Sequence, residues 1–155
     1  MIDVLSYVSS QHRRDFAVAD RDLLQPNSTS PLALEQGEWV AADSDGNMDR
    51  ITSSVLSAVQ VWTQRGDFTA QAIDKVSCLF IGEYEADTDM FDSARTYAVG
   101  DTLTAKSVTI DGSTRAGLTN DVDGGSDFLV GFVTKAPGDD GLLHYRRHTA
   151  QLSPS

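Results

Sequence analysis

The sequence has little of several features that define whole classes of proteins. It has one cysteine among 155 residues, Cys78, which excludes an intrachain disulfide and a zinc site built from cysteines. No stretch approaches the run of about 18 apolar residues that a membrane-spanning helix needs. The chain starts with Met1-Ile2-Asp3-Val4. Because a signal peptide is basic where this segment has an acid, we expect no export by a signal peptide.

Basic residues are also scarce. The 12 lysines and arginines are outnumbered by 23 aspartates and glutamates, which gives a formal net charge of -11. A protein that neutralises phosphates needs a basic surface, and an anionic membrane attracts basic segments. We therefore expect neither nucleic acid nor a membrane as a partner.

The first 30 residues differ from the rest of the chain. Their apolar residues follow no sustained period, and Pro26 and Pro31 bracket a polar stretch typical of a linker. We predict an N-terminal arm over 1–30, a β-rich domain over 31–150 and a tail over 151–155. Such an arm is either a frayed terminus or a segment that orders on a partner's surface. In the second case the arm's apolar residues bind the partner: Leu5, Tyr7, Val8, Phe16, Val18, Leu23 and Leu24.

From residue 32 onward, short apolar or alternating stretches are separated by turns rich in glycine and aspartate, as in antiparallel β proteins. The most continuous apolar runs, 76–81 and 128–133, are predicted as central strands. Their buried residues are expected to include Leu79, Phe80, Leu129 and Phe132. Truncating Phe132 to alanine in a core costs about 3 to 5 kcal/mol.

Further strands are predicted at 97–101, 102–105, 107–110 and 142–146. The segment 51–63 suits a strand or, over its first half, a short helix. The regular spacing of short strands predicts a mainly β protein, an antiparallel β-barrel or sandwich with an extended N-terminal arm.

The densest charge feature is the run from Glu83 to Asp89, in which four carboxylates alternate with other residues. In a strand, side chains two apart share one face. Such a ladder suits a solvated edge that resists self-pairing, an acidic surface for a partner, or a cation site. The spacing differs from that of an EF-hand loop, and we expect no bound metal.

The spacing or the surroundings of the other candidate residues do not suit a metal site or a catalytic site. His144 and His148 lie four apart in a predicted strand, about 13 Å from each other. The segments 43–47 and 121–125 suit Asx-type turns, and Cys78 within an apolar run is typical of an inert buried thiol. We expect no catalytic residues, no cofactor and no enzymatic activity.

The charges are unevenly distributed along the chain. The segment 83–127 has ten acids, whereas 141–155 has no acid and contains Arg146 and Arg147. We expect these two arginines to face an acidic patch of a partner or of a neighbouring copy. Intramolecular balance between the two segments is the alternative.

Several short segments of the sequence, taken in their order along the chain, resemble small structural proteins of tailed bacteriophages. They are PLALEQGEWV at 31–40 with DSDG at 43–46, VWTQRGD at 61–67, LFIGEYEADTD at 79–89, YAVGDTL at 97–103, VGFVTKAP at 130–137 and LLHY at 142–145. The resemblance covers residues 31–146 and is to head decoration, or cement, proteins.

This resemblance implies a virion structural protein that assembles in the host bacterial cytoplasm and lies on the outer capsid surface. There it would bind the major capsid protein and other copies of itself and stabilise the capsid. A lone cysteine suits that reducing cytoplasm. The alternative is a head-fibre or carbohydrate- or receptor-binding module of the virion. In that case Trp39, Trp62, Tyr84 and Tyr97 would have to be displayed to stack on sugars.

Overall fold

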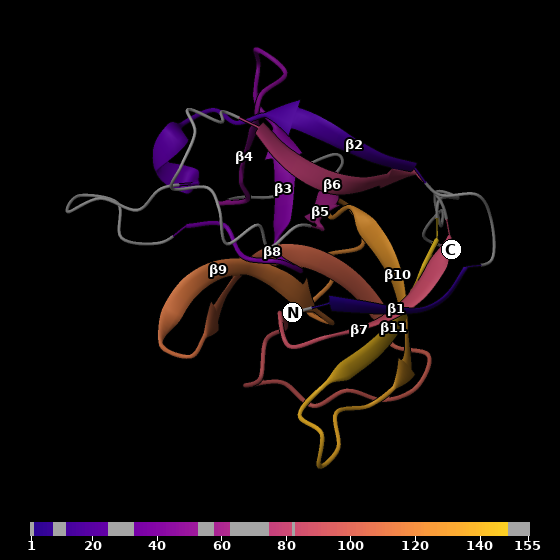
Figure 1. Ribbon diagram of the computed structural model, residues 1–155. Helices are drawn as coiled ribbons and strands as arrows, with labels where there is room; N and C mark the ends of the chain where they lie inside the picture. Colours follow the sequence, from indigo (N-terminus) through magenta and orange to yellow (C-terminus); the bar gives the residue numbers. More distant parts are fainter. Residues whose placement is uncertain are drawn as a thin grey trace.

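The computed structural model describes residues 2–7, 12–24, 33–52, 58–62, 75–81 and 83–148. Their secondary structure is almost entirely strand, arranged in two antiparallel sheets (Figure 1). The helical element of this part of the chain is a short 3-10 turn, η1 (Arg21–Leu23), and no helix there is long and apolar enough to cross a membrane. The predicted mainly β class is confirmed, and the architecture is a sandwich.

The two sheets, called sheet A and sheet B, differ in size. Sheet A has six strands in the order β1 (Ile2–Tyr7), β7 (Tyr84–Thr88), β11 (Leu143–Arg147), β10 (Leu129–Lys135), β8 (Thr102–Ile110) and β9 (Ser113–Thr119). Sheet B has five strands in the order β2 (His12–Ala17), β6 (Lys75–Ile81), β5 (Val59–Val61), β3 (Trp39–Ala42) and β4 (Met48–Arg50).

The main hydrophobic core lies between the sheets. On β11, Leu143, Tyr145 and Arg147 point inward and are buried, while the residues between them are half-buried on the outer face. This is the period of two that a strand imposes. On β7, Tyr84, Ala86 and Thr88 are likewise buried, but Asp87 between them is buried as well. Sheet B contributes Trp39 and Leu79, both fully buried.

Both predicted central strands lie inside their sheets. β6 is flanked by β2 and β5, and β10 by β8 and β11. Leu79 is fully buried as expected, whereas Leu129 is half-buried, and the side chain of Phe80 lies outside the described part of the structure.

The prediction that Phe132 is a core residue is wrong. The register of β10 shifts between Leu129 and Gly131, and the two neighbouring buried side chains are Val130 and Val133. Phe132 is half-buried on the outer face, where its ring lies 5.0 Å from that of His148. A bulge of this kind changes which residues face inward, and a simple alternation rule does not anticipate it.

A second, smaller core lies on the other face of sheet B. Successive residues of β3 divide between the two cores, with Trp39 in the main core and Val40 in the second one. The second core is built from aliphatic side chains together with Met48 and Cys78. Burial raises the pKa of the Cys78 thiol to about 12, with a smaller contribution from Asp15. The expectation that Cys78 is buried and inert agrees with this position.

The N-terminal segment is part of the sandwich. β1 pairs with β7 at the edge of sheet A, and β2 pairs with β6 at the edge of sheet B. After β2, Val18 bridges Met48 of β4, so the two edges of sheet B meet at this point. The expectation of an arm that orders only on another chain is therefore corrected, because backbone pairing within the chain orders it.

Several local elements also differ from the prediction. Residues 102–110 form one continuous strand, and β9 was not predicted. The segment 97–101 is a turn, because Asp101 accepts a hydrogen bond from the Ala98 N–H (2.9 Å) and Gly100 has a φ of 93°. Of the segment 51–63, β5 is a strand, while 53–57 and residue 63 lie outside the described residues.

Candidate functional site

The acidic run from Glu83 to Asp89 is divided between β7 and its ends. Glu85 and Asp87 share the outer face of the strand, Glu83 precedes it, and Asp89 follows it at an exposed bend. In the described part of the chain, no three His, Cys, Asp or Glu residues gather closely enough to hold a metal ion.

The basic C-terminal end neutralises part of this run from within the chain. Arg146 lies opposite Glu85 in the β11–β7 ladder, and its guanidinium is 4.0 Å from Glu85 and 3.7 Å from Glu83. His148 Nδ1 is 3.5 Å from the same Glu83 carboxylate. The structure therefore matches the intramolecular alternative for Arg146.

Arg147 is not placed to meet a partner. Its side chain points into the main core with 5 % of its surface exposed, and its Nη1 donates a hydrogen bond to the Leu79 carbonyl (3.0 Å). The guanidinium carbon lies 5.6 Å from the ring centroid of Trp39 and 5.8 Å from that of Tyr84. The hydrogen bond to Leu79 and the cation–π contact with Trp39 tie sheet A to sheet B, whereas Tyr84 lies in the same sheet as Arg147.

Where their side chains are described, the predicted arm residues also pack within this chain rather than facing a partner. Val18 and Leu24 are buried in the second core, and Phe16 and Leu23 pack against it half-buried. Leu5 and Tyr7 belong to β1, but their side chains lie outside the described part of the structure, as does all of Val8. The four described side chains stabilise this chain itself.

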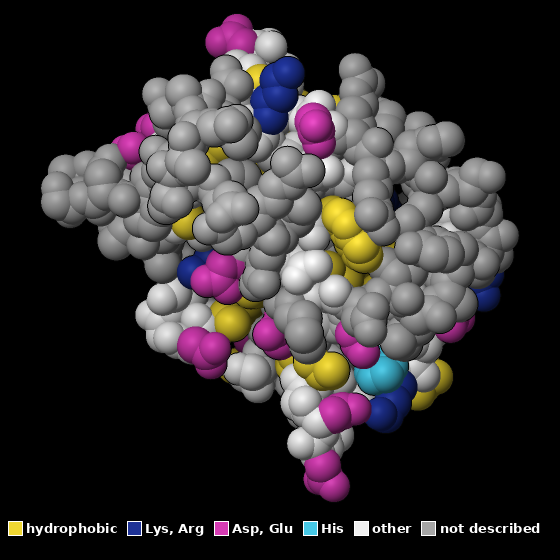
Figure 2. All heavy atoms as spheres, in the orientation of Figure 1, with side chains coloured by type: hydrophobic (Ala, Val, Ile, Leu, Met, Phe, Trp, Pro, Cys, Tyr) yellow, Lys and Arg dark blue, Asp and Glu magenta, His cyan; other side chains and the backbone are white. Residues whose placement is uncertain are grey.

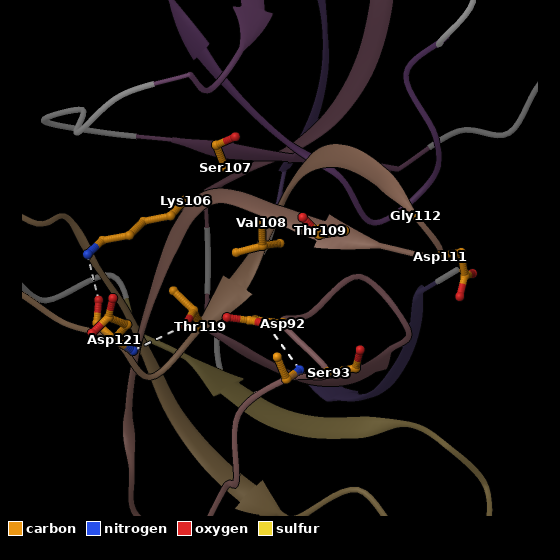
Figure 3. A pocket seen from close by; sticks show the side chains of 11 residues that line it. Asp92, Ser93, Lys106, Ser107, Val108, Thr109, Asp111, Gly112, Thr119 and Asp121 are labelled. Atoms are coloured by element: carbon orange, nitrogen blue, oxygen red, sulfur yellow. Dashed lines mark hydrogen bonds between the residues drawn. The ribbon is translucent and has the colours of Figure 1, made fainter.

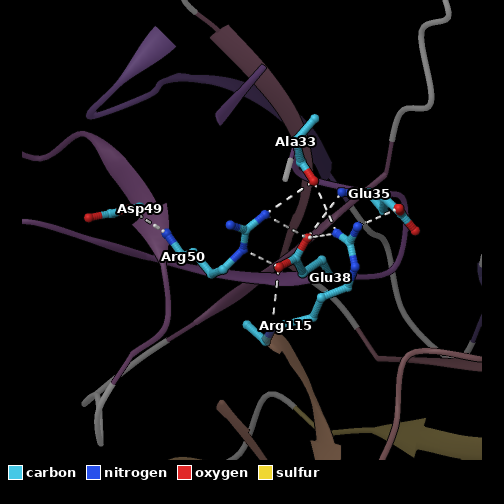
Figure 4. Close-up of polar contacts among 7 residues, drawn as sticks. Ala33, Glu35, Glu38, Asp49, Arg50 and Arg115 are labelled. Carbon is cyan, nitrogen blue, oxygen red and sulfur yellow. Dashed lines mark hydrogen bonds and ion pairs between the residues drawn. The ribbon is translucent and has the colours of Figure 1, made fainter. Parts of the chain in front are cut away.

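A buried ion cluster joins the edges of the two sheets, and sequence reasoning missed it. The carboxylate of Glu38 is fully buried and pairs with Arg50 next to it on β4 and with Arg115 on β9, where the Arg115 Nη1–Oε2 distance is 3.2 Å (Figure 4). Arg115 also pairs with Glu35 at 2.6 Å, and both arginines donate to the Ala33 carbonyl. Two charges of each sign meet here, so each buried charge has partners.

A second polar bridge lies deeper between the sheets. Gln60 on β5 donates to the Gly37 carbonyl (3.0 Å) and accepts from the hydroxyls of Tyr84 (2.9 Å) and Tyr145. Burial and then the neighbouring Tyr84 raise the pKa of Tyr145 well above its ordinary value. The hydroxyl therefore stays protonated and remains a donor, which suits a structural bridge better than acid–base chemistry.

An open hollow of about 620 Å³ lies beside the β8–β9 hairpin (Figure 3). Lys106 lines one side of it and is held by the Asp121 carbonyl (2.6 Å) and the Asp127 carboxylate (2.8 Å). The other lining side chains are mainly carboxylates and hydroxyls, including Asp92, Ser93 and Thr109. Such a lining accepts hydrogen bonds from ammonium, guanidinium or hydroxyl groups of a ligand.

Acidic side chains are also distributed widely over the surface. Figure 2 shows them spread across the face in view, where lysine and arginine side chains are fewer. This agrees with the formal net charge of -11. A surface of this kind attracts basic partners and repels further copies at long range.

No protein-family model, no curated protein and no solved structure matches this chain.

Proposed function

We propose that this protein is a capsid decoration, or cement, protein of a tailed bacteriophage. In this role it binds the major capsid protein on the outer surface of the head and stabilises the capsid. It assembles onto the particle in the host cytoplasm, needs no cofactor, and contacts further copies of itself on the capsid lattice.

One observation carries the proposal. The segments that resemble decoration proteins contain all of β7 and parts of β3, β6, β10 and β11, and these strands contribute to the main core of the sandwich. A resemblance confined to one loop would concern a local motif only. A resemblance distributed over the strands of one core concerns the whole folding unit, and this supports a shared architecture and role.

The structure weighs against the alternative of a sugar-binding module as the sequence suggested it. Trp39, Tyr84 and Tyr97 are buried in the main core, and Trp62 is half-buried against it. Aromatic rings that stack on sugars need an exposed face. The four rings considered for that role are therefore engaged in packing.

Attachment to the capsid rests on the folded surface of the sandwich. The described apolar residues of the N-terminal segment pack inside the chain, so they are not free to anchor it elsewhere. The excess of acidic groups favours a basic contact surface on the capsid, because complementary charges steer association and fix the register. Many copies on one lattice convert modest individual contacts into stable occupancy.

A binding assay tests the proposal. Heads assembled without this protein are mixed with it and sedimented at low and at high salt. We expect saturable co-sedimentation at hundreds of copies per head, weakened by salt, and unchanged by a calcium chelator. Absence of co-sedimentation at either salt concentration, or saturation at a handful of copies, would contradict it.

A further inference from the structure

The chain contains four Asp–Gly pairs, beginning at Asp45, Asp111, Asp123 and Asp140, and all four lie in turns between strands. Among sequences that contain aspartate, Asp–Gly is the one that most readily rearranges without an enzyme. The glycine nitrogen attacks Cγ of the protonated aspartic acid, and one water leaves, so that a five-membered succinimide forms. One water then adds to either ring carbonyl, and the product is aspartate or isoaspartate. Water is the sole co-reactant, and the net change is an isomerisation.

Local structure decides how fast each pair reacts. The carboxyl group must be free to become protonated and to approach the main chain. The glycine N–H must be free of hydrogen bonds, because it becomes the nucleophile. The four pairs share their sequence, so differences between them in the folded protein report these two conditions.

Asp140 fails both conditions. Its carboxylate pairs with Lys135 at 2.9 Å and accepts a hydrogen bond from the Leu142 N–H (3.2 Å). These contacts, the Lys135 hydrogen bond first, lower its pKa to about 2, which disfavours the protonated form. The Gly141 N–H donates to the Gly138 carbonyl (3.0 Å).

Asp45 and Asp123 each fail one condition. The Gly46 N–H donates to the Asp43 carbonyl (3.1 Å), so the nucleophile after Asp45 is engaged. At Asp123 the carboxylate is engaged instead, because its Oδ1 accepts a long hydrogen bond from the Gly125 N–H (3.4 Å).

Asp111 meets both conditions. It stands at the exposed tip of the β8–β9 hairpin, at the far end of the hollow from Asp121 (Figure 3). Among the described residues, neither its carboxylate nor the Gly112 N–H has a hydrogen-bond partner, and a side-chain carbon added at Gly112 would meet open space.

The backbone at Asp111 adds a driving force. Asp111 and Gly112 have φ values of 50° and 76°, as a type I′ turn requires. Asp111 is the one non-glycine residue with positive φ in the described part of the chain, and this conformation is strained for a residue with a side chain. Isoaspartate carries one more main-chain methylene, which relieves that strain and breaks the geometry of the turn.

We propose that Asp111 is the modification site of this protein: in the folded chain it forms succinimide and isoaspartate ahead of the other three Asp–Gly pairs. This inference does not depend on the proposed function. Its consequence is local, because the added methylene loosens the hairpin tip beside the hollow that Asp111 lines.

Ageing the full chain tests the proposal. The folded protein and the same chain unfolded in urea are incubated at neutral pH and body temperature. Isoaspartate at each pair is then quantified by peptide mapping with fragmentation that separates the isomers. The folded-to-unfolded ratio of rates at each site removes the contribution of sequence. We expect the ratio to be highest at Asp111 and several-fold lower at Asp140, with Asp45 and Asp123 between them.

A variant makes the outcome decisive. Asp111→Glu keeps the charge but would need a six-membered ring, so we expect the signal at this position to disappear while the other three sites are unchanged. A ratio at Asp111 as low as that at Asp140, or a higher ratio at any other site, would overturn the proposal.

Discussion

The two hydrophobic cores share sheet B but are stabilised in different ways. The main core is crossed by polar bridges, since Arg147, Gln60 and the Glu38 cluster each connect sheet A or its loops to sheet B. The second core is held by apolar packing of Val18, Leu24 and their neighbours. Polar bridges require particular partners and so fix how the sheets align. Apolar packing stabilises the fold through burial and specifies the alignment less strictly.

The N-terminal segment contributes to both cores. Its first strand extends sheet A, its second extends sheet B, and the residues after them cover the second core. Because sheet B lies in both cores, we expect the whole molecule to unfold as one unit. The following changes weaken the main core, the second core or the surface next to them, in decreasing order of expected effect.

The largest effect is expected in the main core at Glu38. Glu38→Gln removes the fully buried carboxylate that Arg50 and Arg115 share. Breaking a buried ion pair leaves uncompensated charge and costs about 3 to 5 kcal/mol. The free energy of unfolding from urea titration measures the loss.

Glu35→Gln is the matched control, because Glu35 pairs with the same Arg115 but has 46 % of its side chain exposed. An exposed partner contributes about 0 to 1 kcal/mol. Equal losses for the two variants would contradict the role given to Glu38.

The next effect is expected in the second core. Leu24→Ala deletes a side chain with 4 % of its surface exposed, and comparable truncations cost about 2 to 5 kcal/mol. Leu23→Ala, at a half-buried neighbour, is the control and should cost less. If Leu24→Ala leaves the urea midpoint unchanged, this residue does not belong to a core.

A smaller effect is expected on the outer face of sheet A. Phe132 is half-buried and stacks on His148, so Phe132→Ala should cost about 1 to 2 kcal/mol. Leu143→Ala, at a fully buried position of the adjacent strand, should cost about 2 to 5 kcal/mol. If urea titrations show a larger loss in the free energy of unfolding for Phe132→Ala than for Leu143→Ala, Phe132 is a core residue after all.

Alkaline pH should weaken both cores through groups that are buried in the protonated form. Burial raises the pKa of Cys78 from 9.0 to about 12 and, as the first cause, that of Tyr97 from 10.0 to about 12. Both pKa values are higher in the folded state, so their contribution is complete below pH 9 and is lost as the pH rises toward 12. Near pH 10, Cys78 alone should lower the free energy of unfolding by about 1 kcal/mol. Urea titrations of the protein and of Cys78→Ala across this range should show a shallower decline for the variant.

The smallest effect is expected at a surface turn. Lys135→Met removes the first cause of the lowered pKa of Asp140, which should rise from about 2 toward 3.8. An NMR titration of the carboxyl carbon measures this value. A carboxyl group with a lowered pKa stabilises the folded state at pH values above its ordinary pKa. Any stability that Asp140 contributes is therefore lost as the pH falls toward 2. An unchanged pKa would show that the Leu142 amide, rather than Lys135, controls this group.

The sequence predicted the parts of the fold that depend on local pattern. The apolar runs at β6 and β10 identified two interior strands, and the predicted strand 107–110 ends where β8 ends. β9 was missed because Arg115 and Gly117 interrupt its pattern, although both positions are buried. β2 was missed because consecutive charged residues hide an edge strand that is ordered by backbone pairing.

The polar clusters could not be predicted, because their members are far apart in the chain. Arg115 is 77 residues from Glu38, and Tyr145 is 85 residues from Gln60. No spacing rule links such positions before the sheets are assembled. The adjacent residues Arg146 and Arg147 show a related limit, since strand alternation sends one outward to Glu83 and the other into the core.

Removal of residues 1–24 tests whether both cores include the N-terminal segment. Urea unfolding of the full and shortened chains is followed by tryptophan fluorescence, which includes Trp39 in the main core, and by labelling of Cys78 in the second core. We predict coincident transitions in the full chain, and in the shortened chain transitions at much lower urea with rapid labelling of Cys78 in water. Unchanged midpoints and a thiol still protected after the deletion would contradict this account.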